Sequence, residues 1–415
     1  MATVDHHADL IRPATLKRSL SFWLVMLYGL GTTIGAGIFV LVGKVAGVAG
    51  LYAPVAFLVA ALLAGAAALA FAELSGRYPL SAGEAVYVHE GFAVRWLALL
   101  VGLAVALAGL ISAATIARGF VGYLNEFVAL PPPVAIAGVL VLLGLVAAWG
   151  IAESVTLAAL FTLAEAGALV AVIVAGLPVL AELPARTPEL LPPFETVDWT
   201  GILAGAVLAF YAFIGFEDMV NVAEEVRDAP RILPRAILVV LVLTAVLYVG
   251  VALVAVLALP PAELAASEAP LAAVFHAASG LPPTAINLVA IVAVLNGALV
   301  QLIMAARVLY GLADRGWLPS WLAVVNPHTR TPLRATAIVA AICLVLALAF
   351  PLVELARATA YVTLTIFALV NLALFRLKGR APTPAGRFAV PRWVTLAGFA
   401  GCVAMLLFDL VRLLG

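Results

Sequence analysis

The sequence predicts an all-α integral membrane protein of about 11 transmembrane helices, and its composition and run lengths carry this prediction. Of its 415 residues, 66% are hydrophobic and only 11% are charged. A soluble domain carries roughly a quarter of its residues as charged side chains. The apolar runs are long enough for helices to cross a hydrocarbon core about 30 Å thick. They also lack the two-residue alternation of membrane barrel strands.

Eleven apolar runs meet this length criterion, and the ninth is the shortest. Its border with the tenth run is placed at Pro351. The first run follows Lys17 and Arg18, as in a signal peptide, but ten similar runs follow it, so we expect it to be retained as a helix. In chain order the runs are residues 22–43, 51–72, 92–124, 131–149, 156–180, 200–223, 234–258, 283–313, 335–350, 353–376 and 391–413.

The basic residues are distributed unequally between the two ends of these runs. With the N-terminus in the cytoplasm, seventeen Lys and Arg residues fall on the cytoplasmic side and five on the other side or in its half of the membrane. Because basic residues concentrate in cytoplasmic loops, we expect a multi-pass protein of the cell inner (plasma) membrane. Residues 1–21 would be its cytoplasmic N-terminus, and the C-terminus would lie outside. Lys+Arg and Asp+Glu both number 22, so no charge excess favours nucleic acid.

An internal repeat is visible in the spacing of the first ten runs. The third run in each set of five, 92–124 and 283–313, is unusually long. The first run in each set carries a glycine-containing interruption, at residues 31–37 and 210–217. Five helices place the second set in the opposite orientation, and matched interruptions in inverted halves indicate a transporter binding site. The alternative for the glycines of the first interruption is close helix packing.

Several motifs agree in order and spacing with one family. The most specific is Pro230-Arg231 followed by Leu233-Pro234-Arg235-Ala236-Ile237. The sequence resembles the amino acid–polyamine–organocation (APC) superfamily, specifically its bacterial amino acid permeases, over roughly residues 15–380. The other matching segments are residues 31–39, 72–74, 78–79, 81–88, 214–217, 223–226, 306–310 and 314–319.

This resemblance implies a LeuT-type five-plus-five inverted repeat with helices 1 and 6 broken. Residues 22–180 would form the first five-helix repeat, and 200–376 the second, inverted one. Relatives often have two further helices, whereas this chain has room for one extra, peripheral C-terminal helix at 391–413. The implied function is that of a secondary transporter, or permease, that moves amino acids across the lipid bilayer by alternating access.

Backbone groups freed by the two interruptions are the expected substrate ligands, because they have no helical partner and are costly to leave bare in hydrocarbon. The substrate carboxylate would accept N–H groups at a half-helix N-terminus, and its ammonium would donate to free carbonyls. The resemblance implies the same division, with Tyr211 covering the substrate; the alternative for Tyr211 is a packed core aromatic. The candidates are N–H groups of Gly35, Ala36 and Gly37, carbonyls of Thr33, Tyr211, Ala212 and Ile214, and neighbouring Thr32 and Gly215.

Side-chain selectivity is expected from the third, sixth, eighth and tenth runs, with uncharged polar candidates on the third, eighth and tenth. None carries a charge, which favours a small neutral or apolar amino acid, although Arg118 or Glu165 lies within possible reach. These lining candidates are Ser112, Thr115, Asn296, Thr359 and Thr363.

Glu165 lies near the middle of the fifth run and is the candidate for ion coupling, since an ionisable group inside a membrane is costly and commonly functional. Some proton-coupled relatives place a lysine here. The alternative is a carboxyl group satisfied by local hydrogen bonds. Glu217 is a second candidate for coupling. Segment 291–306 offers Asn296 and Gln301 but no Ser or Thr as sodium ligands, which favours H+ over Na+ as the coupling ion.

Other function classes find little support in the sequence. An enzyme would need a cluster of catalytic side chains, and none is visible, so we expect no catalytic residues and no cofactor. The five histidines are scattered over termini and loops, so no metal site is expected. An amino acid exchanger, a polyamine or organocation carrier and a transporter-like sensor remain open alternatives, and the oligomeric state is undetermined.

Overall fold

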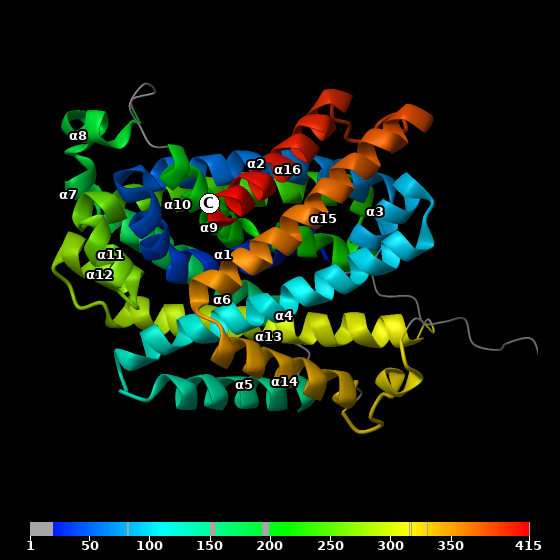
Figure 1. Ribbon diagram of the computed structural model, residues 1–415, viewed down its shortest axis with the longest axis horizontal. Coiled ribbons are helices and arrows are strands. Elements are labelled where there is room, and N and C mark those ends of the chain that lie inside the picture. The colour runs from blue at the N-terminus through cyan, green and yellow to red at the C-terminus, as the bar shows by residue number, and fades with distance from the viewer. Residues whose placement is uncertain are drawn as a thin grey trace, which may run out of the picture.

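The computed structural model describes residues 20–80, 83–149, 155–192, 199–314, 316, 318–329 and 331–414. Most of the predicted cytoplasmic segment 1–21 therefore lies outside the described residues, as do Ser81, Ala82, Arg315 and Trp317 of the quoted motifs. Within the described part, every regular element is a helix (Figure 1). The single exception is an isolated parallel bridge between Leu20 and Val226. The fold is thus all-helical, as predicted.

The long helices coincide broadly with the apolar runs of the sequence. By length and composition, eight helical segments of the described chain qualify as membrane spans, and further apolar helices are shorter. The protein is therefore a multi-pass membrane protein. The long helices are α1 (Phe22–Ala49), α2 (Ala53–Arg77), α4 (Arg95–Asn125), α5 (Pro132–Trp149), α6 (Val155–Ala175), α9 (Trp199–Phe213) with its continuation η2 (Phe216–Glu225), α10 (Ala229–Ala258), α13 (Thr284–Asp314), α14 (Leu333–Ala349), α15 (Leu352–Arg380) and α16 (Arg392–Leu414).

Short helices occupy several connections that the apolar pattern treated as loops or as parts of longer runs. The third run was expected to begin at residue 92, but Ala93 has a φ of 57°, which ends one helix before α4 begins at Arg95. The fifth run was expected to reach 180, but α6 ends at Ala175. The short helices are η1 (Gly50–Tyr52), α3 (Gly83–Phe92), α7 (Leu177–Leu180), α8 (Leu183–Leu190), α11 (Pro261–Ala266), α12 (Pro270–Ser279) and η3 (Ser320–Ala323).

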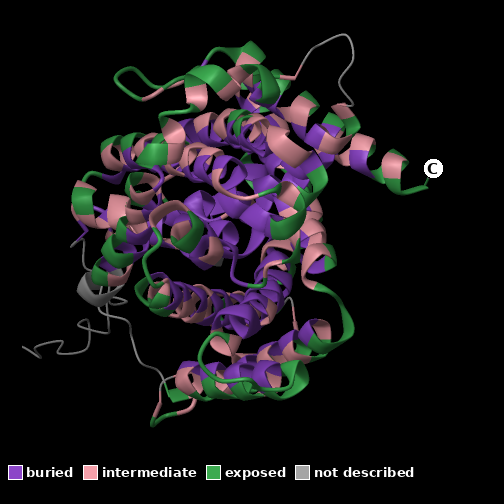
Figure 2. Cartoon of the chain, turned by 90° about the vertical axis from the view of Figure 1, so that its left-hand side faces the viewer, coloured by how far each residue is buried: buried purple, intermediate pink, exposed green. Residues whose placement is uncertain are grey.

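The long helices form two groups. In one group α1 packs against α9 and α10, and α2 packs against the same two helices. In the other group α4 packs along α13, and α5 packs against α14 on the outer side (Figure 1). Buried residues concentrate where the central helices meet, while the outermost helices expose much of their surface (Figure 2). The α1–α9 pair therefore lies in the best-protected part of the fold.

Glu73, near the end of α2, holds together one end of the molecule. Its fully buried carboxylate pairs with Arg77 at 2.6 Å and with Lys378 of α15 at 2.7 Å. It also accepts hydrogen bonds from the Thr383 hydroxyl at 2.6 Å and the Val390 backbone N–H at 2.7 Å. One carboxylate thus ties α2 to the end of α15 and to the segment that leads into α16.

Candidate functional site

The first backbone break lies inside α1. Gly35 has φ 0° and ψ −145°, far from helical values, so two helical halves meet there. This position falls within the interruption predicted at residues 31–37. The hydroxyl of Thr33, just before the break, donates to the Gly29 carbonyl at 2.7 Å. Side-chain hydrogen bonds of this kind occupy carbonyls of the preceding turn and help to end the first half-helix there.

The second break separates α9 from η2 and contacts the first. Gly215 has a φ of 130°, a conformation that suits glycine because it has no Cβ. A Cβ added at Gly215 would lie 2.3 Å from the backbone oxygen of Thr32. The Thr32 hydroxyl lies 2.9 Å from the Gly215 carbonyl and donates to it. The two interruptions, 183 positions apart in the sequence, are therefore hydrogen-bonded neighbours.

Tyr248 of α10 links the two breaks from behind. Its fully buried hydroxyl lies within hydrogen-bond distance of the carbonyl of Thr33, at 2.8 Å, and of Ala212, at 3.0 Å. Both carbonyls were expected to receive the substrate ammonium, and this stays a prediction, because the single Tyr248 O–H can donate to only one of them at a time. Sequence reasoning missed this residue. The available signal was a tyrosine inside an apolar run, because a buried phenol needs a hydrogen-bond partner.

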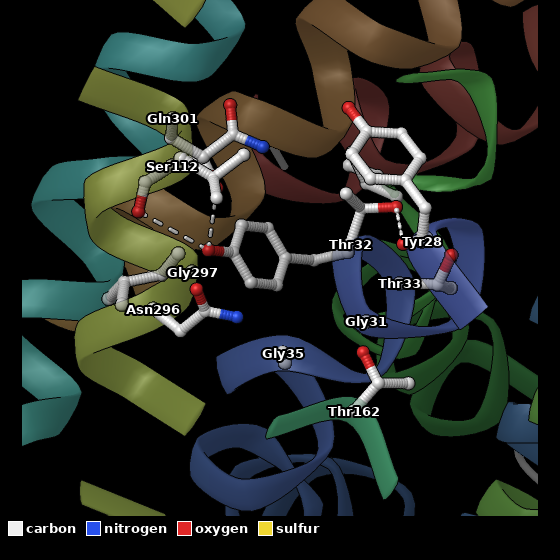
Figure 3. Close-up of a pocket in the computed structure, with 15 residues that line it drawn as sticks. Tyr28, Gly31, Thr32, Thr33, Gly35, Ser112, Thr162, Asn296, Gly297 and Gln301 are labelled. Carbon is white, nitrogen blue, oxygen red and sulfur yellow. Dashed lines mark hydrogen bonds between the residues drawn. The ribbon is translucent and has the colours of Figure 1, made fainter. Parts of the chain in front are cut away.

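A cavity of about 670 Å³ of atom-free space, its opening included, lies in front of the first break. Figure 3 shows Asn296 and Gln301 across the cavity from Thr32 and Thr33. The predicted residues that line it are Thr32, Thr33, Gly35, Gly37, Ser112, Tyr211, Ile214 and Asn296. The lining residues that the sequence did not single out for this cavity are Tyr28, Gly31, Ile116, Thr162, Gly297, Val300 and Gln301.

The other predicted site residues lie nearby but do not line this cavity. Ala212 and Gly215 form the backbone directly around the second break. Ala36 follows Gly35 in the chain, and its backbone belongs to α1. Thr115, a further lining candidate, donates to the Ile111 carbonyl within its own helix.

The glycines of the first interruption have two different roles. A Cβ on Gly31 would lie 2.2 Å from the Thr162 hydroxyl oxygen, and one on Gly37 would lie 2.6 Å from the Ala212 Cα. Close packing therefore accounts for these two, although both also line the cavity. A Cβ at Gly35 would meet no such atom within 4 Å. The space beside Gly35 is thus open, and Gly35 lines the cavity.

Tyr211 closes the space between α9 and α4. Its hydroxyl and that of Ser112 lie 3.0 Å apart, and both side chains are buried. This contact joins the two helix groups across the cavity. Tyr211 therefore lines the cavity through a polar contact and is more than a core aromatic.

Tyr211→Phe is expected to raise the KM for the transported solute about 2- to 10-fold, since a hydrogen bond contributes roughly 0.5–1.5 kcal/mol net. Ser112→Ala should do the same. Concentration-dependent uptake by both single variants and the double variant measures the effect. The double variant should be no worse than either single one. Additive losses would show that the two hydroxyls act independently.

The two candidate coupling acids lie in different surroundings. Glu165 of α6 is fully buried and interacts electrostatically with Tyr248, the residue that joins the breaks. It does not line the cavity. Glu217, in the first turn of η2, accepts the Gly215 backbone N–H at 2.8 Å and lines a second cavity beside the first. Thr359 and Thr363 of α15 also line this second cavity.

Comparison with known proteins places these features in a family. A profile of the family described as amino acid permease matches residues 20–412. The chain belongs to the amino acid permease family. The branched-chain amino acid permease BcaP of Bacillus subtilis is 28% identical to it over 403 residues, which cover 93% of this chain and 86% of the relative.

Two further relatives are somewhat more similar to this permease in sequence. The mitochondrial cationic amino acid transporter 3 of Arabidopsis thaliana is 30% identical over 405 residues, which cover 92% of this permease but 64% of the plant protein. An uncharacterised transporter of Mycobacterium tuberculosis is 32% identical over 401 residues, covering 95% of this permease and 86% of that protein. The expected resemblance to bacterial amino acid permeases is thus confirmed, and the protein is a transporter by family.

Proposed function

We propose that this permease is a secondary active transporter that binds the α-amino and α-carboxyl groups of amino acids at the paired breaks of α1 and α9–η2. The observation that carries the proposal is the hydrogen bond between Thr32, just before the first break, and Gly215 at the second break, beside one cavity. Relatives whose names specify branched-chain or cationic amino acids support it. All amino acids share the α-amino and α-carboxyl groups, so a site that binds these two groups would accept amino acids as a class.

The substrate carboxylate would accept N–H groups of Gly35, Ala36 and Gly37, which begin the second half of α1. A helix N-terminus offers free N–H groups and a partial positive charge. The carbonyl of Ile214 is a candidate acceptor for the ammonium. The side-chain oxygen of Asn296 is another, because it is buried without a hydrogen-bond partner in the described structure and its residue lines the cavity.

The architecture that we propose is the five-plus-five inverted repeat, with 22–180 and 200–376 as repeats and α16 as a peripheral addition. In such a repeat α1 corresponds to α9, α2 to α10, α4 to α13 and α5 to α14. Each of these four pairs packs directly together, an arrangement that a pseudo-two-fold axis between the repeats would produce. Moreover α4 and α13 both have 31 residues. The charge distribution supports a cytoplasmic N-terminus and an outer C-terminus in the plasma membrane.

Alternating access would follow from movement of the α1–α2–α9–α10 group against the α4–α5–α13–α14 group. The cavity lies between them, because its lining comes from α1 and α9 on one side and from α4 and α13 on the other. A proton is the proposed coupling ion, with Glu165 and Glu217 as the groups that exchange it. Glu165 is well placed, since it acts on Tyr248 and hence on both breaks.

Glu165→Gln is expected to abolish accumulation driven by a pH gradient, because an amide cannot release a proton. Exchange of labelled for unlabelled substrate needs no net proton movement and should persist. Uptake into proteoliposomes with and without an imposed pH gradient measures the difference. Glu126→Gln, an exposed acid at the end of α4, is the matched control. Unchanged proton-driven accumulation in Glu165→Gln would contradict its role.

The test of the proposed function is uptake of a panel of labelled amino acids into proteoliposomes under imposed pH and sodium gradients. We expect uptake of at least one amino acid, stimulated by a pH gradient and indifferent to sodium. Uptake only against internal amino acid would indicate an exchanger, and uptake of polyamines alone an organocation carrier. Binding without uptake would indicate a sensor, and neither binding nor uptake of any amino acid would refute the proposal.

A further inference from the structure

A second cavity beside the first is lined by three acidic side chains from two elements. Glu84 comes from α3, and Glu217 and Asp218 come from the first turn of η2. Their exposed fractions are only 3%, 8% and 4%. The cavity encloses about 390 Å³ of atom-free space, its opening included. Three carboxyl groups therefore share one largely buried space.

No basic side chain neutralises these acids within the described residues. Other buried carboxylates in the same molecule are neutralised. Glu73 and Asp409 each have two lysine or arginine nitrogens within 2.6 to 3.2 Å. Glu84, Glu217 and Asp218 belong to no ion pair of the described chain. A buried anion without a cation is costly, so a cationic partner would be bound strongly there.

Uncharged hydrogen-bond acceptors without a partner also line this cavity. The side-chain oxygen of Gln301 and the hydroxyl of Thr363 line this cavity, are more than nine-tenths buried and have no hydrogen-bond partner in the described structure. Gln301 already hydrogen-bonds to Asp218, so its free oxygen is a separate acceptor. The lining thus offers several hydrogen-bond acceptors and three carboxyl groups that a bound cation would favour in their ionised form. Its natural ligand carries several N–H donors and a positive charge.

The second cavity continues the first. Ser112, Ile214 and Gln301 line both cavities. A substrate held at the two breaks by its α-amino and α-carboxyl groups would therefore send its side chain past Ile214 toward the acids. The described residues contain no group of three His, Cys, Asp or Glu side chains placed to hold a metal ion. An organic cation with several N–H donors matches the acceptors that line this cavity.

We propose that the acidic cavity of Glu84, Glu217 and Asp218 binds the positively charged end of a dibasic amino acid's side chain. This inference rests on the proposed function and names its substrate class. It departs from the neutral side chain that the sequence favours. That expectation relied on uncharged lining positions; Thr359 and Thr363 line the second cavity, and Ser112 and Asn296 line the first. The acids enter only where α3 and η2 meet beyond it.

The cationic substrate should bind more tightly as the pH rises. Burial raises the pKa of Glu84 to about 8, and the nearby Asp218 carboxyl adds to the shift. Below this pKa Glu84 is protonated, and a bound cation favours its ionised form, so binding releases a proton. The titratable groups near Glu84 are Glu217 and Asp218 on η2 and Tyr87 on its own helix, whereas the linings from α4, α13 and α15 are uncharged.

Arginine and citrulline form the matched pair of probes, because citrulline replaces the guanidinium by a neutral urea of nearly the same shape. We expect the full-length protein in proteoliposomes to take up arginine with a KM lower than that for citrulline by about 10-fold or more. Citrulline would leave the buried acids without a charged partner, and the loss of one partner of a buried charge pair weakens binding by at least that factor. The advantage should grow between pH 6.5 and 8.5. Glu84→Gln should reduce the preference for arginine, measured as the KM for citrulline divided by the KM for arginine. Glu90→Gln changes an exposed acid on the same helix and should leave this preference unchanged.

The outcomes separate the two proposals. Uptake of neutral amino acids without any preference for arginine over citrulline would overturn this inference and leave the proposed function standing. Uptake of no amino acid at all would overturn both. The wild-type comparison needs no variant, so a poorly folded Glu84→Gln protein leaves the test intact. Asp218→Asn provides a second variant, with the same expected loss of preference.

Discussion

Gly215→Ala is expected to reduce uptake to the background of empty vesicles. The Cβ of alanine would lie 2.3 Å from the Thr32 oxygen, well inside contact distance. The neighbouring atoms are backbone, so no flexible side chain can move aside. The φ of 130° adds strain of about 1–3 kcal/mol for any residue with a side chain. The clash and the backbone strain can be relieved only if the two breaks move apart. This movement would also separate the proposed substrate ligands.

Gly280→Ala is the matched control. Gly280 also has a positive φ, 70°, but a Cβ there would meet nothing within 4 Å, and the residue lies at the end of α12, away from the cavity. This variant should lose about 1 kcal/mol of stability and keep its transport. Uptake and the thermal unfolding midpoint in detergent, measured on both variants, distinguish local strain from damage to the site. Normal uptake by Gly215→Ala would contradict the proposed role of the second break.

Glu73→Ala should cause the largest loss of stability of any single substitution considered. It would leave Arg77 and Lys378 without their common anion, and Thr383 and the Val390 N–H without an acceptor. Removal of one partner from a buried ion pair costs about 3–5 kcal/mol. The midpoint of thermal unfolding in detergent, at one fixed heating rate, measures the loss.

Glu189→Ala removes an exposed ion pair with Arg186 and serves as the control. It should change stability by less than about 1 kcal/mol, because solvent and ions screen such pairs. Equal midpoints for the two variants would show that the buried position of Glu73 does not matter. A selective loss in Glu73→Ala would establish that this carboxylate joins α2 to the end of α15.

The sequence predicted the helices and the two breaks because both are local features. Apolar length sets a membrane helix, and glycine inside such a run marks where it can stop. The breaks at Gly35 and Gly215 lie within the predicted segments 31–37 and 210–217. Their residue-level positions needed the structure, since Gly31 and Gly37 serve packing and Gly35 opens on the cavity.

Contacts between distant residues were not predictable from the sequence alone. The Tyr248 hydroxyl lies within hydrogen-bond distance of carbonyls 36 and 215 positions away, and every residue type carries a backbone carbonyl, so the sequence does not mark these acceptors. The acidic cavity was missed for a related reason. Glu84 falls in a segment read as a loop, whereas it lies on a helix that brings it beside Glu217 and Asp218. In the sequence these acids resemble ordinary loop or helix-end residues, and only the fold places all three around one cavity.

The most direct test of backbone recognition at the two breaks is a comparison of amino acids with analogues that lack one α-substituent. Arginine and leucine would each be titrated into the purified protein, alongside the amine that lacks the carboxylate and the acid that lacks the ammonium. If the breaks bind both groups, each analogue of a bound amino acid should bind about 10- to 100-fold more weakly, since a hydrogen bond to a charged group contributes roughly 1.5–3 kcal/mol. An analogue that binds as tightly as its parent amino acid would contradict the account.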